Sequence, residues 1–156
     1  MRKILIALDY YPSAQKVAEQ GFELAKSMNA AVYLLHVISD PSYYSTADYS
    51  PIMGFSGYVN NDPTQLDTVE ILKRASQEFL EKTKLHLGDP DIQTLVYEGD
   101  VAEVILQRVK KNHADILVMG SHSRKWFENI VLGSVAEEVL RHITIPLYFI
   151  PTRRQG

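Results

Sequence analysis

The chain contains no cysteine, which excludes a disulfide framework, a thiolate nucleophile and a cysteine-based metal site. It has no excess of positive charge either, because 16 Lys and Arg residues are outnumbered by 19 Asp and Glu residues. Proteins that bind nucleic acid or an anionic membrane are usually basic, so neither partner is expected. No apolar run approaches the length of a membrane span, and the run at 4–8 is too short for a signal peptide. We therefore expect a cytoplasmic protein.

Familiar motifs of nucleotide chemistry are also missing. The P-loop pattern G-x-x-x-x-G-K-[ST] does not occur, and the turn at 9–13 has no glycine, which excludes the usual dinucleotide fingerprint. No serine stands with a base in a recognisable nucleophile motif, and no H-x3-H or carboxylate cluster predicts a metal site. The sequence therefore indicates no catalytic residue and no metal ligand.

What the chain does contain is the balance of an ordinary globular protein. Its 156 residues are 46% hydrophobic and 22% charged, which favours a single domain over 1–156. Continuous apolar runs at 4–8, 31–38, 92–97, 116–119 and 146–150 are typical of strands buried on both faces. Apolar residues at three- and four-residue spacing predict helices at 12–28, 62–83, 100–109 and 133–140. This alternation predicts an α/β fold with an open, doubly wound sheet of five parallel strands and four helices.

Two further features mark the boundaries of these elements. Asp62 with Gln65, and Asp100 with Glu103, resemble capping boxes at the starts of two helices. The Tyr-rich stretch at 39–61 has no clear period and is predicted to be a long loop. Such a loop either packs on its own side chains or covers a binding site or partner surface.

The most informative stretch runs from 114 to 134. A buried strand ends at Gly120, a loop follows, and Gly133 and Ser134 open an amphipathic helix. Glycines let a ligand approach the backbone, and the free N–H groups of a first helical turn attract an anion. The stretch therefore predicts a phosphate site, although a tight turn before an ordinary helix would give the same pattern.

Asp9 follows the first predicted strand and is a second candidate. If the first and fourth strands are neighbours, Asp9 and Gly120 face each other across the crevice where doubly wound sheets bind ligands. Its carboxylate can accept sugar hydroxyls, or it can cap the next helix or face solvent. His36 lies inside an apolar strand and is expected to be a core residue.

These residues resemble the universal stress protein family. Nucleotide-binding members carry G-x2-G-x9-G-[ST] after the fourth strand, and this chain reads Gly120-x2-Ser123-x9-Gly133-Ser134 with the spacing kept. Asp9 matches the acidic residue that ends the family's first strand, and the segments 35–38 and 99–105 are similar to family segments. The resemblance covers nearly the whole chain, and it departs at Ser123, which replaces the second glycine.

The resemblance implies a strand order of 3-2-1-4-5 and a homodimer formed through the last strand, 146–150. It also implies an adenine nucleotide, ATP or AMP. Because the sequence indicates no catalytic residue and no metal ligand, we expect any Mg²⁺ to be carried by the phosphates and at most slow ATP hydrolysis. Adenine would lie at Val37 and the ribose near Asp9, while the phosphates would lie along Gly120, Ser123, Gly133 and Ser134. The remaining expected contacts are Ala7, Leu8, Met119, His122, Arg124 and Val135.

Two functions remain open. In the first, the nucleotide acts as a signal, and the chain is a regulatory module of the stress response with an unidentified protein partner. In the second, Ser123 marks a lost phosphate site, and the chain is a nucleotide-free homodimeric interaction protein of the same fold. The enzymes of the wider adenine nucleotide α-hydrolase-like fold group fit less well, because their S-G-G-x-D-S and H-I-G-H motifs are absent.

Overall fold

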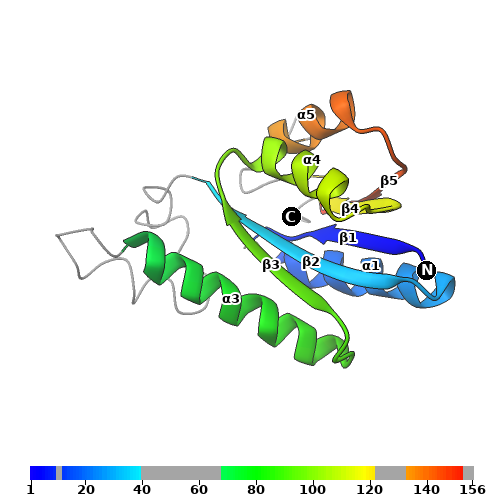
Figure 1. The fold of residues 1–156 in the computed structure, drawn as a ribbon, viewed down its shortest axis with the longest axis horizontal. Coiled ribbons are helices and arrows are strands. Elements are labelled where there is room, and N and C mark those ends of the chain that lie inside the picture. The colour runs from blue at the N-terminus through cyan, green and yellow to red at the C-terminus, as the bar shows by residue number, and fades with distance from the viewer. Residues whose placement is uncertain (10–11, 40–67, 122–132, 153–156) are drawn as a thin grey trace.

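The computed structural model describes residues 1–9, 12–39, 68–121 and 133–152. Strands and helices alternate along these ranges, as Figure 1 shows. In chain order they are β1 (Lys3–Ala7), α1 (Ser13–Met28), β2 (Ala31–Ile38), α3 (Thr68–Leu87), β3 (Gln93–Glu98), α4 (Val101–Lys111), β4 (Ile116–Gly120), α5 (Ser134–His142) and β5 (Leu147–Ile150). None of the helices in the described ranges combines the length and apolar character needed to cross a bilayer.

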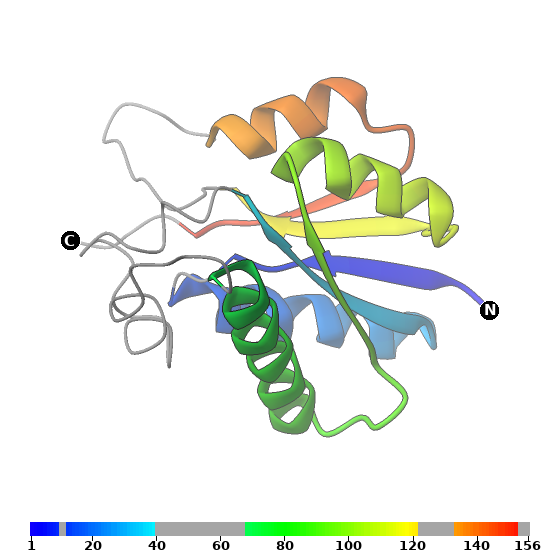
Figure 2. The same ribbon diagram turned by 60° about the vertical axis from the view of Figure 1, so that its left-hand side comes forward.

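The five strands form one sheet in the order β3-β2-β1-β4-β5, and every neighbouring pair is parallel. The central strand β1 pairs with β2 on one side and β4 on the other, so that Ile4 lies opposite both Val32 and Ile116. Helices α1 and α3 cover one face, and α4 and α5 cover the other (Figures 1 and 2). The fold class and the strand order expected from the family resemblance are therefore confirmed.

Each face of the sheet buries its own apolar cluster because side chains alternate along a strand. Ile4, Ile6 and Leu8 pack with α1 and α3, whereas Leu5 and the half-buried Ala7 pack with α4 and α5. Helix α1 approaches the sheet closely at Gly21, where an added Cβ atom would lie 2.7 Å from Cδ1 of Ile6. Both faces of the sheet are thus sealed, which leaves its ends as the places where a ligand can enter.

Most element boundaries differ from the predicted ones by one to four residues. The third strand was predicted at 92–97 but is Gln93–Glu98, because Ile92 belongs to the preceding turn and donates its N–H to Asp89. Ile92 is nevertheless buried, which explains why its apolar character suggested a strand. The predicted helix start at 62 and all but the first residue of the predicted loop at 39–61 lie outside the described residues.

Candidate functional site

The carboxyl ends of β1 and β4 mark the point where the chain changes faces. The connection after β1 runs through α1 on one face, and the connection after β4 runs through α5 on the other (Figure 2). In doubly wound sheets, ligands bind at this reversal of strand order. The predicted neighbour relation between the first and fourth strands is therefore confirmed.

A buried histidine fixes the end of β1. The N–H of Leu8 donates to the carbonyl of Leu35 at 2.8 Å, so pairing with β2 continues one residue beyond the strand. His36, only 2% exposed, places Nδ1 at 2.9 Å from the carbonyl oxygen of Leu8. A carbonyl only accepts hydrogen bonds, so Nδ1 carries the proton and donates it. His36 is thus the core residue that the sequence predicted, and it holds the backbone beside Asp9.

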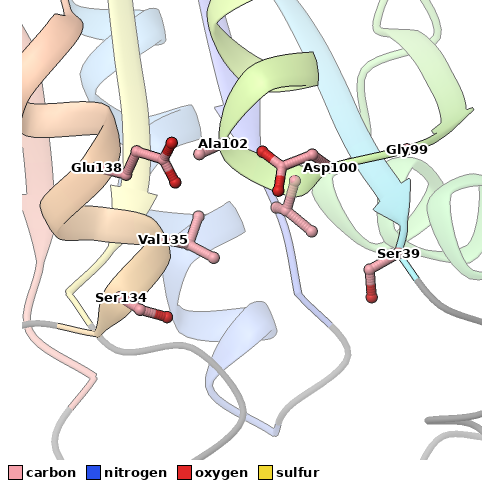
Figure 3. Close-up of a pocket in the computed structure, with 8 residues that line it drawn as sticks. Ser39, Gly99, Asp100, Ala102, Ser134, Val135 and Glu138 are labelled. Atoms are coloured by element: carbon pink, nitrogen blue, oxygen red, sulfur yellow. The ribbon is translucent and has the colours of Figure 1, made fainter.

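A pocket of about 360 Å³ opens where α4 and α5 begin (Figure 3). Residues from the end of β2, the start of α4 and the first turns of α5 line it: Ser39, Gly99, Asp100, Val101, Ala102, Ser134, Val135 and Glu138. Two helix N-termini therefore converge on one cavity at the carboxyl end of the sheet. This arrangement offers backbone N–H groups to a ligand.

Helix α4 begins with a glycine turn and a capping carboxylate. Gly99 has a φ of +140°, a conformation that favours glycine, and its N–H donates to the carbonyl of Ile38 at 2.9 Å. Asp100 follows as the N-cap, and its Oδ2 accepts from the N–H of Glu103 at 3.0 Å. The cap predicted at Asp100 is confirmed. The start of α4 is therefore already satisfied by a negative charge of the chain itself.

Helix α5 begins without such a cap. Its N-cap is Gly133, which has no side chain with which to cap the first-turn N–H groups. The N–H of Gly133 itself donates to the carbonyl of Ser121 at 2.8 Å. Ser134 is exposed and lines the pocket. Of the two helix starts at the pocket, α5 is thus the one whose N-cap residue adds no negative charge.

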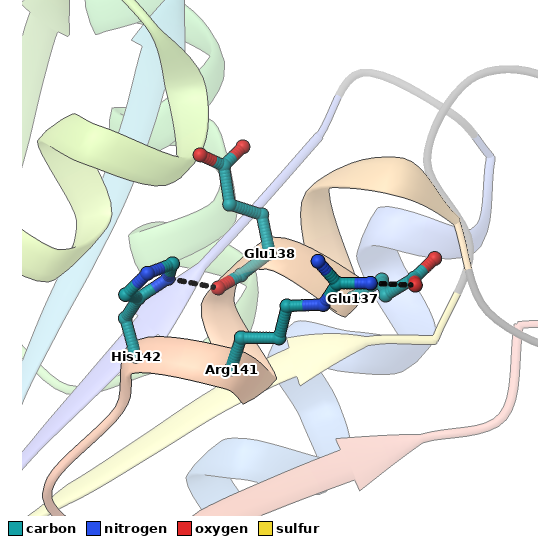
Figure 4. A network of polar contacts seen from close by, with 4 residues as sticks. All are labelled: Glu137, Glu138, Arg141 and His142. Atoms are coloured by element: carbon teal, nitrogen blue, oxygen red, sulfur yellow. Dashed lines mark hydrogen bonds and ion pairs between the residues drawn. The ribbon is translucent and has the colours of Figure 1, made fainter.

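The described wall of the pocket carries carboxylates and no Lys or Arg. Asp100 and Glu138 come from opposite sides of the cavity (Figure 3). On α5, the Arg141 guanidinium donates to the Glu137 carboxylate at 3.0 Å (Figure 4). His142 donates through Nδ1 to the Glu138 carbonyl at 3.0 Å. One end of the pocket therefore suits groups that donate hydrogen bonds, while the start of α5 suits an anion.

The predicted site residues fall into separate places. Ser134 and Val135 line the pocket. Ala7, Val37 and Met119 belong to the apolar cluster under α4 and α5. Asp9 is partly exposed beyond the end of β1. The predicted contacts His122, Ser123 and Arg124 lie outside the described residues.

Two of the predicted residues face α1 instead. Leu8 packs in the cluster on the α1 side, so only its backbone lies at the crevice. At Gly120, an added Cβ would lie 2.7 Å from Cγ2 of Thr152 and 3.3 Å from Cγ2 of Val17. Packing on the α1 side thus accounts for this glycine, whereas the sequence suggested that it admits a ligand.

Six lining residues were not predicted as site residues: Ser39, Gly99, Asp100, Val101, Ala102 and Glu138. The sequence could have indicated Asp100, because its capping pattern places it at a helix start, and helix starts lie at the carboxyl ends of parallel strands. Glu138 lies on the polar side of α5 and has no such pattern. No three His, Asp or Glu side chains of the described ranges gather as metal ligands.

Comparison with known sequences gives one family. The sequence pattern of the Universal stress protein family matches residues 1–151. "Universal stress protein MJ0531" of Methanocaldococcus jannaschii is 30% identical over 151 residues, which are 96% of this chain and 81% of that protein. "Universal stress protein A" of Escherichia coli is 26% identical and is aligned over 97% of this chain and 95% of its own length.

Solved structures agree with this assignment. A universal stress family protein from Burkholderia pseudomallei has a TM-score of 0.66 at 25% identity, with 96% of each chain covered. A universal stress protein in complex with cAMP has a TM-score of 0.61 at 20% identity and covers 97% of each chain. The Archaeoglobus fulgidus protein in complex with dAMP has a TM-score of 0.60 at 18% identity, covering 96% of this chain and 97% of its own. On sequence and fold together, the chain belongs to the universal stress protein family.

Proposed function

We propose that this chain binds an adenine nucleotide, ATP or AMP, and acts as a nucleotide-responsive regulatory module in a stress response. The observation that carries the proposal is the pocket beside the uncapped start of α5. Two structural neighbours were solved with cAMP and dAMP, and this supports the same ligand class here.

The phosphates belong at α5 rather than at α4. A phosphate needs unsatisfied donors, and at α4 the Asp100 carboxylate already accepts from the N–H of Glu103 and repels a second anion. The first turn of α5 has no side-chain cap in the described residues, and Ser134 adds a hydroxyl donor. His122, Ser123 and Arg124 stay predictions as further phosphate contacts, and any Mg²⁺ would arrive with the phosphates.

The nucleoside belongs near Asp9. Asp9 lies two residues after Ala7, so if the alternation of β1 continues past Leu8 its side chain lies on the face covered by α4 and α5. Carboxylates accept hydrogen bonds from ribose hydroxyls. The apolar cluster that contains Val37 and Met119 lies under the same face and suits a purine ring. Ribose near Asp9 and adenine near Val37 therefore complete the proposed site.

One observation favours the nucleotide-free alternative, in which the chain is a homodimeric interaction protein. Packing against Thr152 and Val17 accounts for Gly120 without any ligand. In that alternative the pocket would be empty in cells, and the function would lie in the dimer.

Two measurements separate these functions. Mass spectrometry of the denatured protein, purified from cells, should reveal ATP or AMP. Titration calorimetry with ATP and Mg²⁺ should then show binding that Ser134→Ala weakens by about 1 kcal/mol, or about fivefold. Ser27→Ala is the matched control, because Ser27 is exposed on α1 and donates only to the Leu24 carbonyl. No heat and no thermal shift at millimolar ATP would support the nucleotide-free alternative.

A further inference from the structure

We infer that Ser121 is a positioning residue that couples the start of α5 to the C-terminal segment after β5, and so regulates nucleotide affinity. We name the contacts among Ser121, Gly133, Ile150 and Thr152 the Ser121 junction. The effect on affinity rests on the proposed function, whereas the junction itself is tested without a nucleotide.

Ser121 makes three hydrogen bonds to two separate parts of the chain. Its carbonyl accepts from the N–H of Gly133, the N-cap of α5, at 2.8 Å. Its N–H donates to the carbonyl of Ile150, the last residue of β5, at 3.0 Å. Its Oγ accepts from the N–H of Thr152 at 3.3 Å. A single residue after β4 therefore ties the proposed phosphate site to the outer strand of the sheet.

The segment after β5 is held against the junction from the other side. The Thr152 side chain covers Gly120, where it leaves no room for a Cβ atom. The Lys16 ammonium of α1 donates to the carbonyl of Pro151 at 2.9 Å. Residues 150–152 thus bridge α1, the end of β4 and Ser121.

This arrangement makes the position of the α5 N–H groups depend on whether residues 150–152 stay bound in place. If residues 150–152 detach, Ser121 loses two of these three partners, and the Gly133 contact loses its support. Reciprocity requires the converse, so an anion bound at α5 must stabilise the segment by the same free energy. A partner that binds the outer edge of β5 would therefore change the affinity of the pocket through the Ser121 junction.

The nucleotide-free test is hydrogen exchange on the full chain. Ser121→Ala removes the hydroxyl that accepts from the Thr152 N–H and keeps both backbone bonds. We expect it to raise the exchange rate of the Gly133 amide about threefold to tenfold while the Ile6 amide in β1 is unchanged. Ser27→Ala should change neither amide. An unchanged Gly133 amide, or an equal rise at Ile6, would overturn the junction.

A second variant removes the same bond from its other side. Thr152→Pro deletes the N–H donor together with the side chain that covers Gly120. A double variant with Ser121→Ala should therefore exchange no faster at Gly133 than Thr152→Pro alone. Additive effects would mean that the two residues act independently, against the inference.

The regulatory step is tested by calorimetry with ATP. Ser121→Ala should weaken ATP binding about threefold to tenfold, and ATP should slow exchange at the Thr152 amide of the unchanged protein. Equal affinities, or no effect at Thr152, would overturn the regulation. If the unchanged protein binds no ATP, the proposed function and the regulation both fail, whereas the exchange data still decide whether the junction exists.

Discussion

Asp100 and Gly133 hold equivalent N-cap positions on the two helices that begin at the pocket, yet only Asp100 caps its helix with a side chain. Asp100 supplies a fixed negative charge, whereas Gly133 has no side chain and supplies none. The negative charge of an N-cap therefore lies on the α4 side of the pocket only. A ligand with one anionic end should bind with that end towards the start of α5.

An aspartate cap on α5, like that of α4, should stabilise the fold but weaken ATP binding. Gly133 has a φ of −70°, which any residue can adopt. Gly133→Asp should raise the free energy of unfolding by about 0.5 kcal/mol and weaken ATP binding more than tenfold, because the carboxylate competes with phosphate. Gly133→Asn caps without charge and should weaken binding less. Denaturant unfolding and calorimetry measure the two effects, and full ATP affinity in the Asp variant would contradict the assignment of the phosphates to α5.

We propose that the chain forms a homodimer through β5. This strand lies at the edge of the sheet, and Tyr148 is 40% exposed on it. Exposed apolar edges pair with other chains, and a twofold axis makes the pairing antiparallel. Light scattering should give twice the chain mass of 17.7 kDa. Tyr148→Glu should reduce this to one chain mass, whereas Leu85→Glu, at an 80% exposed leucine of α3, should not. A monomer before any substitution would refute the proposal.

The close approach of α1 to the sheet should make Gly21 intolerant of substitution. Alanine is the better helix former, but its Cβ would meet Ile6 and Val118, which are fully buried and cannot move aside. We expect Gly21→Ala to lower the free energy of unfolding by about 1–2 kcal/mol. Ile6→Val removes the nearest atom, Cδ1, so the double variant should be more stable than the sum of the two changes predicts. Strict additivity in urea unfolding would show that the helix shifts instead.

Glu19 and His86 join α1 to α3 through a contact of 2.8 Å. The hydrogen bond from His86, followed by that from Gln15, lowers the pKa of Glu19 below its ordinary value of 4.5. A carboxyl whose folded-state pKa is depressed stabilises the fold above its unfolded pKa, and this contribution is lost as the pH falls through the lowered pKa. The relevant window is therefore acidic, below pH 4.5.

His86→Ala should return the pKa of Glu19 towards 4.5 and reduce the loss of stability in that acidic window. The carboxyl carbon signal of Glu19 in an NMR titration reports the pKa directly. Lys84→Ala, which changes a charge in the same last turn of α3, is the control. If His86→Ala leaves the titration of Glu19 unchanged, the hydrogen bond is not its cause.

The sequence predicted the fold well where burial and backbone conformation agree. The apolar runs at 31–38 and 116–119 correspond to β2 and β4 within one residue, since every residue there is paired in the sheet. Ile92 shows the limit, because it is buried from a turn and apolar character alone does not distinguish that case from a strand. The strand order came from the family resemblance, as local periodicity says nothing of which strands are neighbours.

The candidate site was predicted only in part. Ser134 and Val135 were identified through the motif, and the structure places both at the pocket. Glu138 and Ser121 could not be identified from the sequence, because their roles depend on contacts with α4 and β5 that only the tertiary fold creates. Gly120 was interpreted through the motif, and its close packing with Thr152 could be seen only in three dimensions.

The hydrogen bond between Gly133 and Ser121 also bears on how the fold tolerates a change in chain length. It joins the two ends of the segment 122–132 independently of what lies between them. Lengthening a loop with fixed ends costs only about 0.6 kcal/mol for each doubling. A change in the length of this segment should therefore cost the fold little stability, as long as the hydrogen bond keeps the end of β4 and the start of α5 together.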